Sequence, residues 1–88
     1  MKPIKIGKMA AFSIVRVDSD DAVTLSISGD AEHRVMICSM ASGRVSVGID
    51  KNNFGIGEGG MWKVRGDEVC RIRNAGVEEG VIHVVACA

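Results

Sequence analysis

The chain has 88 residues and a mass of 9.3 kDa, the size of one small domain. Its 11 basic residues balance 11 acidic residues, so the formal net charge is zero, and its aromatic residues are two Phe and one Trp. A neutral chain with so few aromatic rings disfavours a dedicated binder of nucleic acids or anionic membranes. No apolar run reaches the length of about 18 residues that a membrane-spanning segment needs.

Three cysteines, Cys38, Cys70 and Cys87, are odd in number and match no CxxC spacing. A disulfide framework or a structural zinc site is therefore not expected. Free thiols suit a reducing compartment, the cytosol or the nucleus, and no apolar stretch of a secretory signal follows Met1.

Short β-branched stretches separated by turn-forming residues predict an all-β chain. Strict alternation of apolar and polar residues predicts half-buried strands at 23–28 and 44–49. In chain order, strands are expected at residues 10–17, 23–28, 34–40, 44–49, 61–64, 69–73 and 81–87. About seven or eight strands in one domain covering residues 1–88 are typical of a sandwich or barrel.

Two of these expected strands, 34–40 and 81–87, are apolar on both faces. In the first, Val35, Ile37 and Ser39 alternate with Met36, Cys38 and Met40; in the second, Val81, His83, Val85 and Cys87 alternate with Ile82, Val84 and Ala86. Only one face of a sheet meets the core of a small two-layer domain. A second copy of the chain is the simplest cover for the other face, and the alternative is a closed barrel packed by residues 1–9.

The candidate interface residues come from these strands and from the large aromatic side chains Trp62 and Phe54, since aromatic residues often anchor contacts. Alternation alone does not say which row of each strand faces the core. The candidates are Met36, Cys38, Met40, Phe54, Trp62, Ile82 and Val84.

No motif in the chain predicts catalysis, a metal site or a bound cofactor. Residues 55–60 fit G-x-G-x-x-G, but a strand follows instead of the helix that a dinucleotide site needs, so a glycine-rich hairpin connection is expected. His33 and His83 lack the close spacing of metal ligands. The three cysteines lie in apolar strands, where thiols are usually inert.

Residues 34–88 resemble the C-terminal cupin domain of the centromere protein C (CENP-C) family. Residues 42–47 (SGRVSV) look like the family's S-G-K-V-x-V, and residues 54–64 (FGIGEGGMWKV) look like F-x-I-x-x-G-G-M-F-x-V. Residues 72–74 (IRN) then stand where the family has I-x-N. Residues 64–70 (VRGDEVC) depart from the usual V-P-x-G-N-x-Y, which indicates a divergent member.

The resemblance implies a cupin-like jelly roll without a metal site. Met36 stands at the position of the metal-binding Glu of cupins, and Cys70 stands at the position of the second motif's His. It also implies a non-catalytic homodimerisation module near the C-terminus of a longer, nuclear inner-kinetochore scaffold. That module would have itself and other centromere or kinetochore proteins as partners, without membrane or direct DNA binding.

Two alternatives remain at this point. One is a cupin domain that binds a protein or peptide and so recruits a centromeric loading or meiotic factor. The other is a cupin that binds a small ligand.

Overall fold

The computed structural model describes residues 2–6, 11–27 and 34–87, and every regular element in this part is a β-strand. The nine strands are β1 (Lys2–Ile6), β2 (Ala11–Val17), β3 (Ala22–Ile27), β4 (Val35–Ser42), β5 (Val45–Ile49), β6 (Asn52–Ile56), β7 (Met61–Arg65), β8 (Cys70–Arg73) and β9 (Gly80–Cys87). The all-β expectation is confirmed. No helix long and apolar enough to cross a membrane occurs in the described residues.

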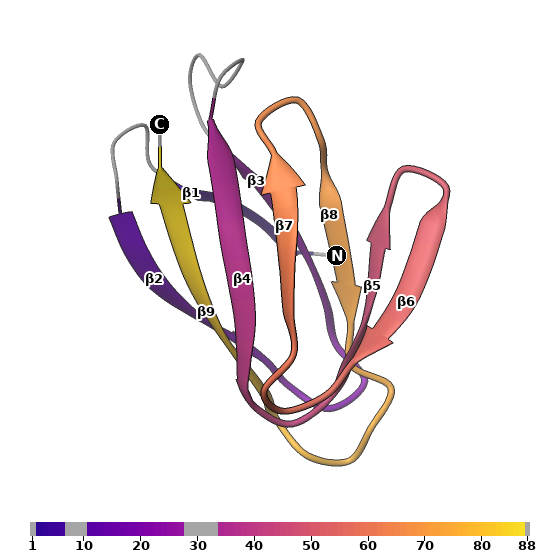
Figure 1. Ribbon diagram of the computed structural model, residues 1–88. Helices are drawn as coiled ribbons and strands as arrows, with labels where there is room; N and C mark the ends of the chain where they lie inside the picture. Colours follow the sequence, from indigo (N-terminus) through magenta and orange to yellow (C-terminus); the bar gives the residue numbers. More distant parts are fainter. Residues whose placement is uncertain (1, 7–10, 28–33, 88) are drawn as a thin grey trace.

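The strands form two sheets that face each other (Figure 1). One has five strands in the order β1-β3-β8-β5-β6, and the other has four in the order β2-β9-β4-β7. The pair β1 and β3 is parallel, and the remaining pairs are antiparallel. The turn spacing predicts a sandwich or barrel and the family resemblance implies a jelly roll, and the observed jelly-roll sandwich agrees with both.

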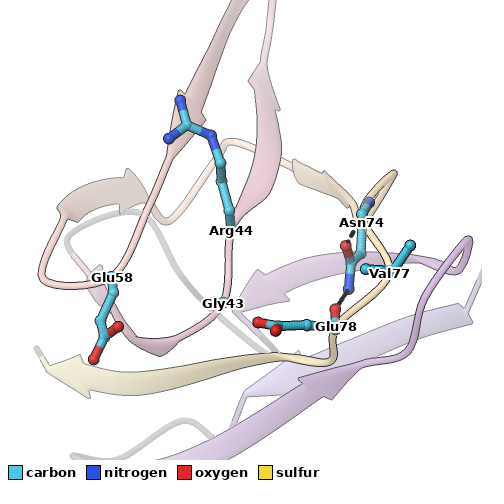
Figure 2. Close-up of a pocket in the computed structure, with 7 residues that line it drawn as sticks. Gly43, Arg44, Glu58, Asn74, Val77 and Glu78 are labelled. Carbon is cyan, nitrogen blue, oxygen red and sulfur yellow. Dashed lines mark hydrogen bonds between the residues drawn. The ribbon is translucent and has the colours of Figure 1, made fainter.

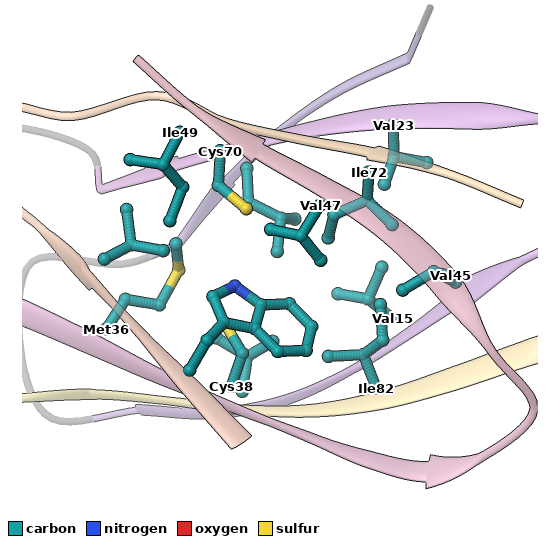
Figure 3. Packing of buried hydrophobic residues seen from close by; sticks show 14 of the residues in the cluster. Val15, Val23, Met36, Cys38, Val45, Val47, Ile49, Cys70, Ile72 and Ile82 are labelled. Carbon is teal, nitrogen blue, oxygen red and sulfur yellow. The ribbon is translucent and has the colours of Figure 1, made fainter. Parts of the chain in front are cut away.

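The core fills the space between the sheets with one side-chain row from each strand. Alternate residues of β3 and β5 are buried, as the period-two pattern predicts. Figure 3 shows aliphatic, Met and Cys side chains from both sheets meeting there. The largest fully buried ones are Leu25, Met36, Ile72 and Ile82. This core is the main source of stability for so small a domain.

Two strands lie outside the sequence prediction. Strand β1 lies in the segment treated as a possible end cover, and it pairs with β3 at the edge of the five-stranded sheet. An edge position tolerates Pro3, which has no N–H to donate. Strand β6 begins inside the expected turn 50–53, because the turn is shorter: Asp50 takes a left-handed conformation with φ of 53° and Asn52 already pairs with Ile49.

The glycine-rich segment 57–60 is not the hairpin that was expected. It joins β6 of one sheet to β7 of the other. The Gly59 amide donates a hydrogen bond to the Met40 carbonyl over 3.0 Å, and the Met40 amide donates to the Gly60 carbonyl over 2.9 Å. These bonds fasten the crossover to β4, and a strand follows it, so a dinucleotide-binding turn is excluded.

Candidate functional site

The outer face of the four-stranded sheet carries an exposed group of apolar side chains. Cross-strand register places Phe12, Val85 and Ile37 in one row across β2, β9 and β4. The next row contains Ile14 and His83, with Ser39 and Met61 completing it on β4 and β7. We call Phe12, Ile14, Ile37, Met61, His83 and Val85 the outer apolar face.

These side chains are unusually exposed for their type. Phe12 is 60% exposed, Met61 65% and Ile14 52%, while Ile37 and Val85 are close to 40%. The ring of Phe12 packs edge-on against His83 with 5.4 Å between the ring centroids. Clustered apolar exposure of this kind marks an interaction surface, whereas single exposed apolar residues are ordinary.

Six of the seven interface candidates lie in the core of the single chain. The residues Met36, Cys38, Met40, Trp62, Ile82 and Val84 are at most 7% exposed, and Phe54 is half-buried against the same core. A second chain has no access to those six side chains while the domain is folded. The surface open to a partner is therefore the opposite row of the same strands, with Ile37 on β4 and Val85 on β9.

Three members of the outer apolar face were missed by the sequence reasoning: Phe12, Ile14 and Met61. The signal was present in strand 11–17, because Phe12 and Ile14 alternate with buried Val15 and Val17. This strand is thus apolar on both faces, like β4 and β9. Met61 carried no such signal, since it is a single apolar residue at the start of β7.

The described thiols are unsuited to nucleophilic catalysis. Burial raises the pKa of Cys38 far above its ordinary value, and it raises the pKa of Cys70 to about 11, although the neighbouring indole of Trp62 lowers the latter somewhat. Both thiols are free and point into the core, whereas His83 faces outward on β9. They therefore form no Cys–His pair with it. His33 lies outside the described residues.

No group of three His, Cys, Asp or Glu side chains that could hold a metal ion occurs in the described part of the chain. The two positions aligned with cupin metal ligands, Met36 and Cys70, are both buried. A neutral thioether and a thiol with a raised pKa do not supply the His and carboxylate donors of a metal-dependent cupin.

A surface hollow of about 350 Å³ lies where the loops after β4, β6 and β8 meet (Figure 2). Its residue Asn74 is fully buried, and Asn74 Nδ2 donates hydrogen bonds to the carbonyls of Val17 and Glu78 at 2.9 and 2.7 Å. The Gly76 amide donates to Asn74 Oδ1 at 3.0 Å. The bond to Val17 fastens loop 74–80 to β2, and the bonds with Glu78 and Gly76 hold the loop together, so Asn74 has a structural role.

The three charged side chains of this hollow, Arg44, Glu58 and Glu78, do not converge on one point. Figure 2 shows the Arg44 guanidinium turned away from the carboxylates of Glu58 and Glu78. The hollow lacks the paired acid and base, or nucleophile and base, that hydrolytic and transfer reactions need.

Comparison with solved structures identifies the fold. The chain superposes on the plu4264 protein of Photorhabdus luminescens with a TM-score of 0.75 at 10% identity. It matches the Cnp3 cupin domain of Schizosaccharomyces pombe with a TM-score of 0.75 at 16% identity, and a predicted oxalate decarboxylase of Thermotoga maritima with the same score and identity. No family model and no curated protein matches the sequence.

These matches cover 88%, 92% and 89% of the present chain. In turn, the chain spans 61%, 57% and 66% of the three matched chains. At these identities the likeness establishes the cupin fold alone. The matched structures include a predicted enzyme as well as a cupin domain with no activity in its name, so the fold does not select between catalysis and binding.

Proposed function

We propose that this cupin domain is a non-catalytic homodimerisation module. The observation that carries the proposal is the outer apolar face, which five exposed apolar side chains and His83 form across all four strands of one sheet. Interfaces between identical subunits are more apolar than transient ones. A second copy supplies the same apolar surface, and one twofold axis covers both faces at once.

The size of the sheet is compatible with a dimer interface. Four strands at about 4.8 Å spacing and an eight-residue β9 give a face on the order of 500 Å² in plan. Side-chain relief raises the accessible area towards the ~800 Å² per partner of a standard interface. Lys63 and Arg65 on the edge strand β7 then lie at a polar rim.

The cellular role follows from the resemblance to CENP-C. Cnp3, whose cupin domain is among the matched structures, is a CENP-C homologue. We place the chain in an inner-kinetochore scaffold in the nucleus, where dimerisation doubles every binding motif carried elsewhere on the scaffold. Two weak motifs on one dimer bind a shared target with a high effective concentration, so the mechanism is avidity without chemistry.

The dimer is tested by measuring molar mass with light scattering behind a sizing column over a range of concentrations. The wild-type chain should give about twice 9.3 kDa. Ile37→Lys, in the middle of the outer apolar face, should give a folded monomer because a dimer would bury two unpaired ammonium groups. Val77→Lys is the matched control, since Val77 is 93% exposed in loop 74–80, away from that face.

A wild-type monomer at every concentration, or an intact Ile37→Lys dimer, would contradict the proposed interface. The cellular role needs a separate experiment. A fluorescent fusion of the full-length protein should mark centromeres in dividing cells of the source organism, and the Ile37→Lys variant should mark them more weakly. Diffuse wild-type fluorescence would remove the kinetochore assignment and leave the dimerisation result standing.

A further inference from the structure

The outer face of the other sheet has a different chemical character from the outer apolar face. Cross-strand register places Arg71 of β8, Gly48 of β5 and Asn53 of β6 in one row. The neighbouring row contains Arg73, Ser46 and Gly55 on the same three strands. The outer surface along β5 therefore carries only small side chains or none, and it is flanked by the longer arginine side chains of β8.

Two hollows follow this low surface. One, of about 290 Å³, is lined by Ser46, Gly48, Asn53, Arg71 and Arg73 together with Ala22 and the backbone between them. The other, of about 210 Å³, is lined by Arg44, Ser46, Gly55 and loop 75–76. Ser46 lines both hollows, so they lie next to each other along β5. We call Arg44, Ser46, Gly48, Gly55, Arg71 and Arg73 the basic trough.

Glycines shape the floor of the basic trough. A Cβ atom at Gly48 would lie 2.8 Å from Asn53 Oδ1, so a side chain at this position would displace the amide that borders the trough. Cβ atoms at Gly55 and Gly57 would lie 3.6 and 3.4 Å from the guanidinium nitrogens of Arg44. The distances at Gly55 and Gly57 are ordinary van der Waals contacts and place the Arg44 guanidinium beside these glycines, whereas the close approach at Gly48 keeps the trough open next to Asn53.

The three arginines of the basic trough have no carboxylate partner. Across the part of the chain that the structure describes, the one ion pair within 4.0 Å joins Arg16 to Glu79, on the opposite side of the sandwich. Neither hollow is lined by Asp or Glu. Two uncompensated cations on β8 and a third just before the neighbouring strand β5 therefore create a local positive potential in a chain whose net charge is zero.

We propose that the basic trough binds an acidic peptide segment of another protein in an extended conformation. Guanidinium groups hold carboxylates in bidentate pairs, and alternate residues of β8 place two of them about 7 Å apart, the spacing of alternate side chains in an extended peptide. The described lining has no aromatic side chain on which nucleic-acid bases would stack.

The experiment is fluorescence polarisation with a labelled ten-residue peptide of alternating Glu and Ser, compared with a Lys-Ser peptide of the same length. Arg71→Glu/Arg73→Glu reverses two charges in the basic trough. Lys63→Glu/Arg65→Glu makes the same charge change on the other sheet and controls for net charge. Because these two residues lie at the rim of the proposed dimer interface, the peptide affinities are compared at a protein concentration where light scattering shows the same molar mass for both variants. Circular dichroism and thermal unfolding check that each variant folds, and Arg71→Gln/Arg73→Gln replaces the first variant if it does not.

The acidic peptide should bind the wild-type chain with higher affinity than the basic peptide does. Reversal in the trough should weaken binding by about tenfold or more, and higher salt should weaken the wild-type interaction. Equal affinity of the two double variants, no binding of the acidic peptide, or tighter binding of an oligothymidine would each overturn the proposal. The molar mass of the Arg71→Glu/Arg73→Glu variant should remain that of the wild type, which separates this site from the dimer interface.

Discussion

Two consecutive residues of β9 test the assignment of core and outer face directly. Val84 is fully buried between the sheets, and Val85 is 41% exposed on the outer apolar face. The substitutions Val84→Glu and Val85→Glu are chemically identical and one residue apart. They should nevertheless act on different equilibria, because alternate residues of a strand point to opposite faces.

Val84→Glu should lower the stability of the fold, whereas Val85→Glu should lower the affinity of the dimer. At position 84 a carboxylate would be buried without a partner, which costs several kcal/mol. A domain of this size has a total unfolding free energy of about 5–15 kcal/mol, so most of the stability is lost. At position 85 folding is nearly unaffected, since the carboxylate remains in water in the monomer.

The dimer is where Val85→Glu should act. Fully burying a valine side chain contributes about 1.5–3 kcal/mol, so covering the 41% that remains exposed contributes about 1 kcal/mol per chain. Because the twofold axis repeats this contact, the dimer would lose about 2 kcal/mol of binding free energy, which raises its dissociation constant roughly 30-fold. Desolvation of the two carboxylates weakens it further.

The assay combines thermal unfolding by circular dichroism with molar mass by light scattering. Val84→Glu should lose the cooperative transition, and Val85→Glu should keep it while shifting to the monomer mass. A folded Val84→Glu chain would refute the core assignment. A Val85→Glu dimer as tight as the wild type would refute the outer apolar face as the interface.

Three further predictions concern stability. Burial raises the pKa of Cys70 from 9.0 to about 11, so the folded chain keeps this proton at a pH where the unfolded chain releases it. The free energy of unfolding, measured by urea denaturation, should be constant below pH 9 and fall by up to about 2.7 kcal/mol from this group as the pH rises towards 11. The fall should be smaller in Cys70→Ala, and a flat wild-type profile would contradict the burial of the thiols. Asn74→Ala leaves two backbone carbonyls and one backbone amide without their hydrogen-bond partner. It should lower the free energy of unfolding, measured by chemical denaturation, by about 3 kcal/mol. A loss below about 1 kcal/mol would show that water replaces the side chain. Gly43→Ala places a Cβ atom 2.6 Å from the Glu79 carbonyl oxygen, at a φ of +80°. It should lower the melting temperature more than Gly59→Ala, because Gly59 has a similar φ of +86° but open space around it. Equal shifts in melting temperature would mean that only backbone strain matters.

Local pattern was sufficient for most of the fold. Alternation in β3 and β5 predicted both the strands and the buried members of each, because period two is a property of the extended backbone itself. The spacing of turn-forming residues predicted a sandwich or barrel. Pairing across long distances was not predictable: β1 lies beside β3 through parallel pairing to a strand about twenty residues away, and β6 follows a turn of only two residues.

The sequence predicted which strands carry the interaction surface, but the candidate residues were taken from the wrong face of those strands. The sequence alone determined that β4 and β9 are apolar on both faces and that something must cover the second one. The outer rows contain the polar residues Ser39 and His83, and this was the available sign that they face away from the core. Alternation assigns residues to a common face without saying which way that face points.

Only the tertiary structure decided the direction. The five-stranded sheet packs over Met36, Cys38 and Met40 of β4, which leaves Ile37 outside. The pairing of β5 with β8 brings Arg44, just before β5, to the same surface as Arg71 and Arg73 of β8, although no spacing in the sequence connects them. The sequence determines which residues are neighbours within one strand. Which residues become neighbours across strands depends on how the strands pair and on which faces of the sheets bury the most apolar area.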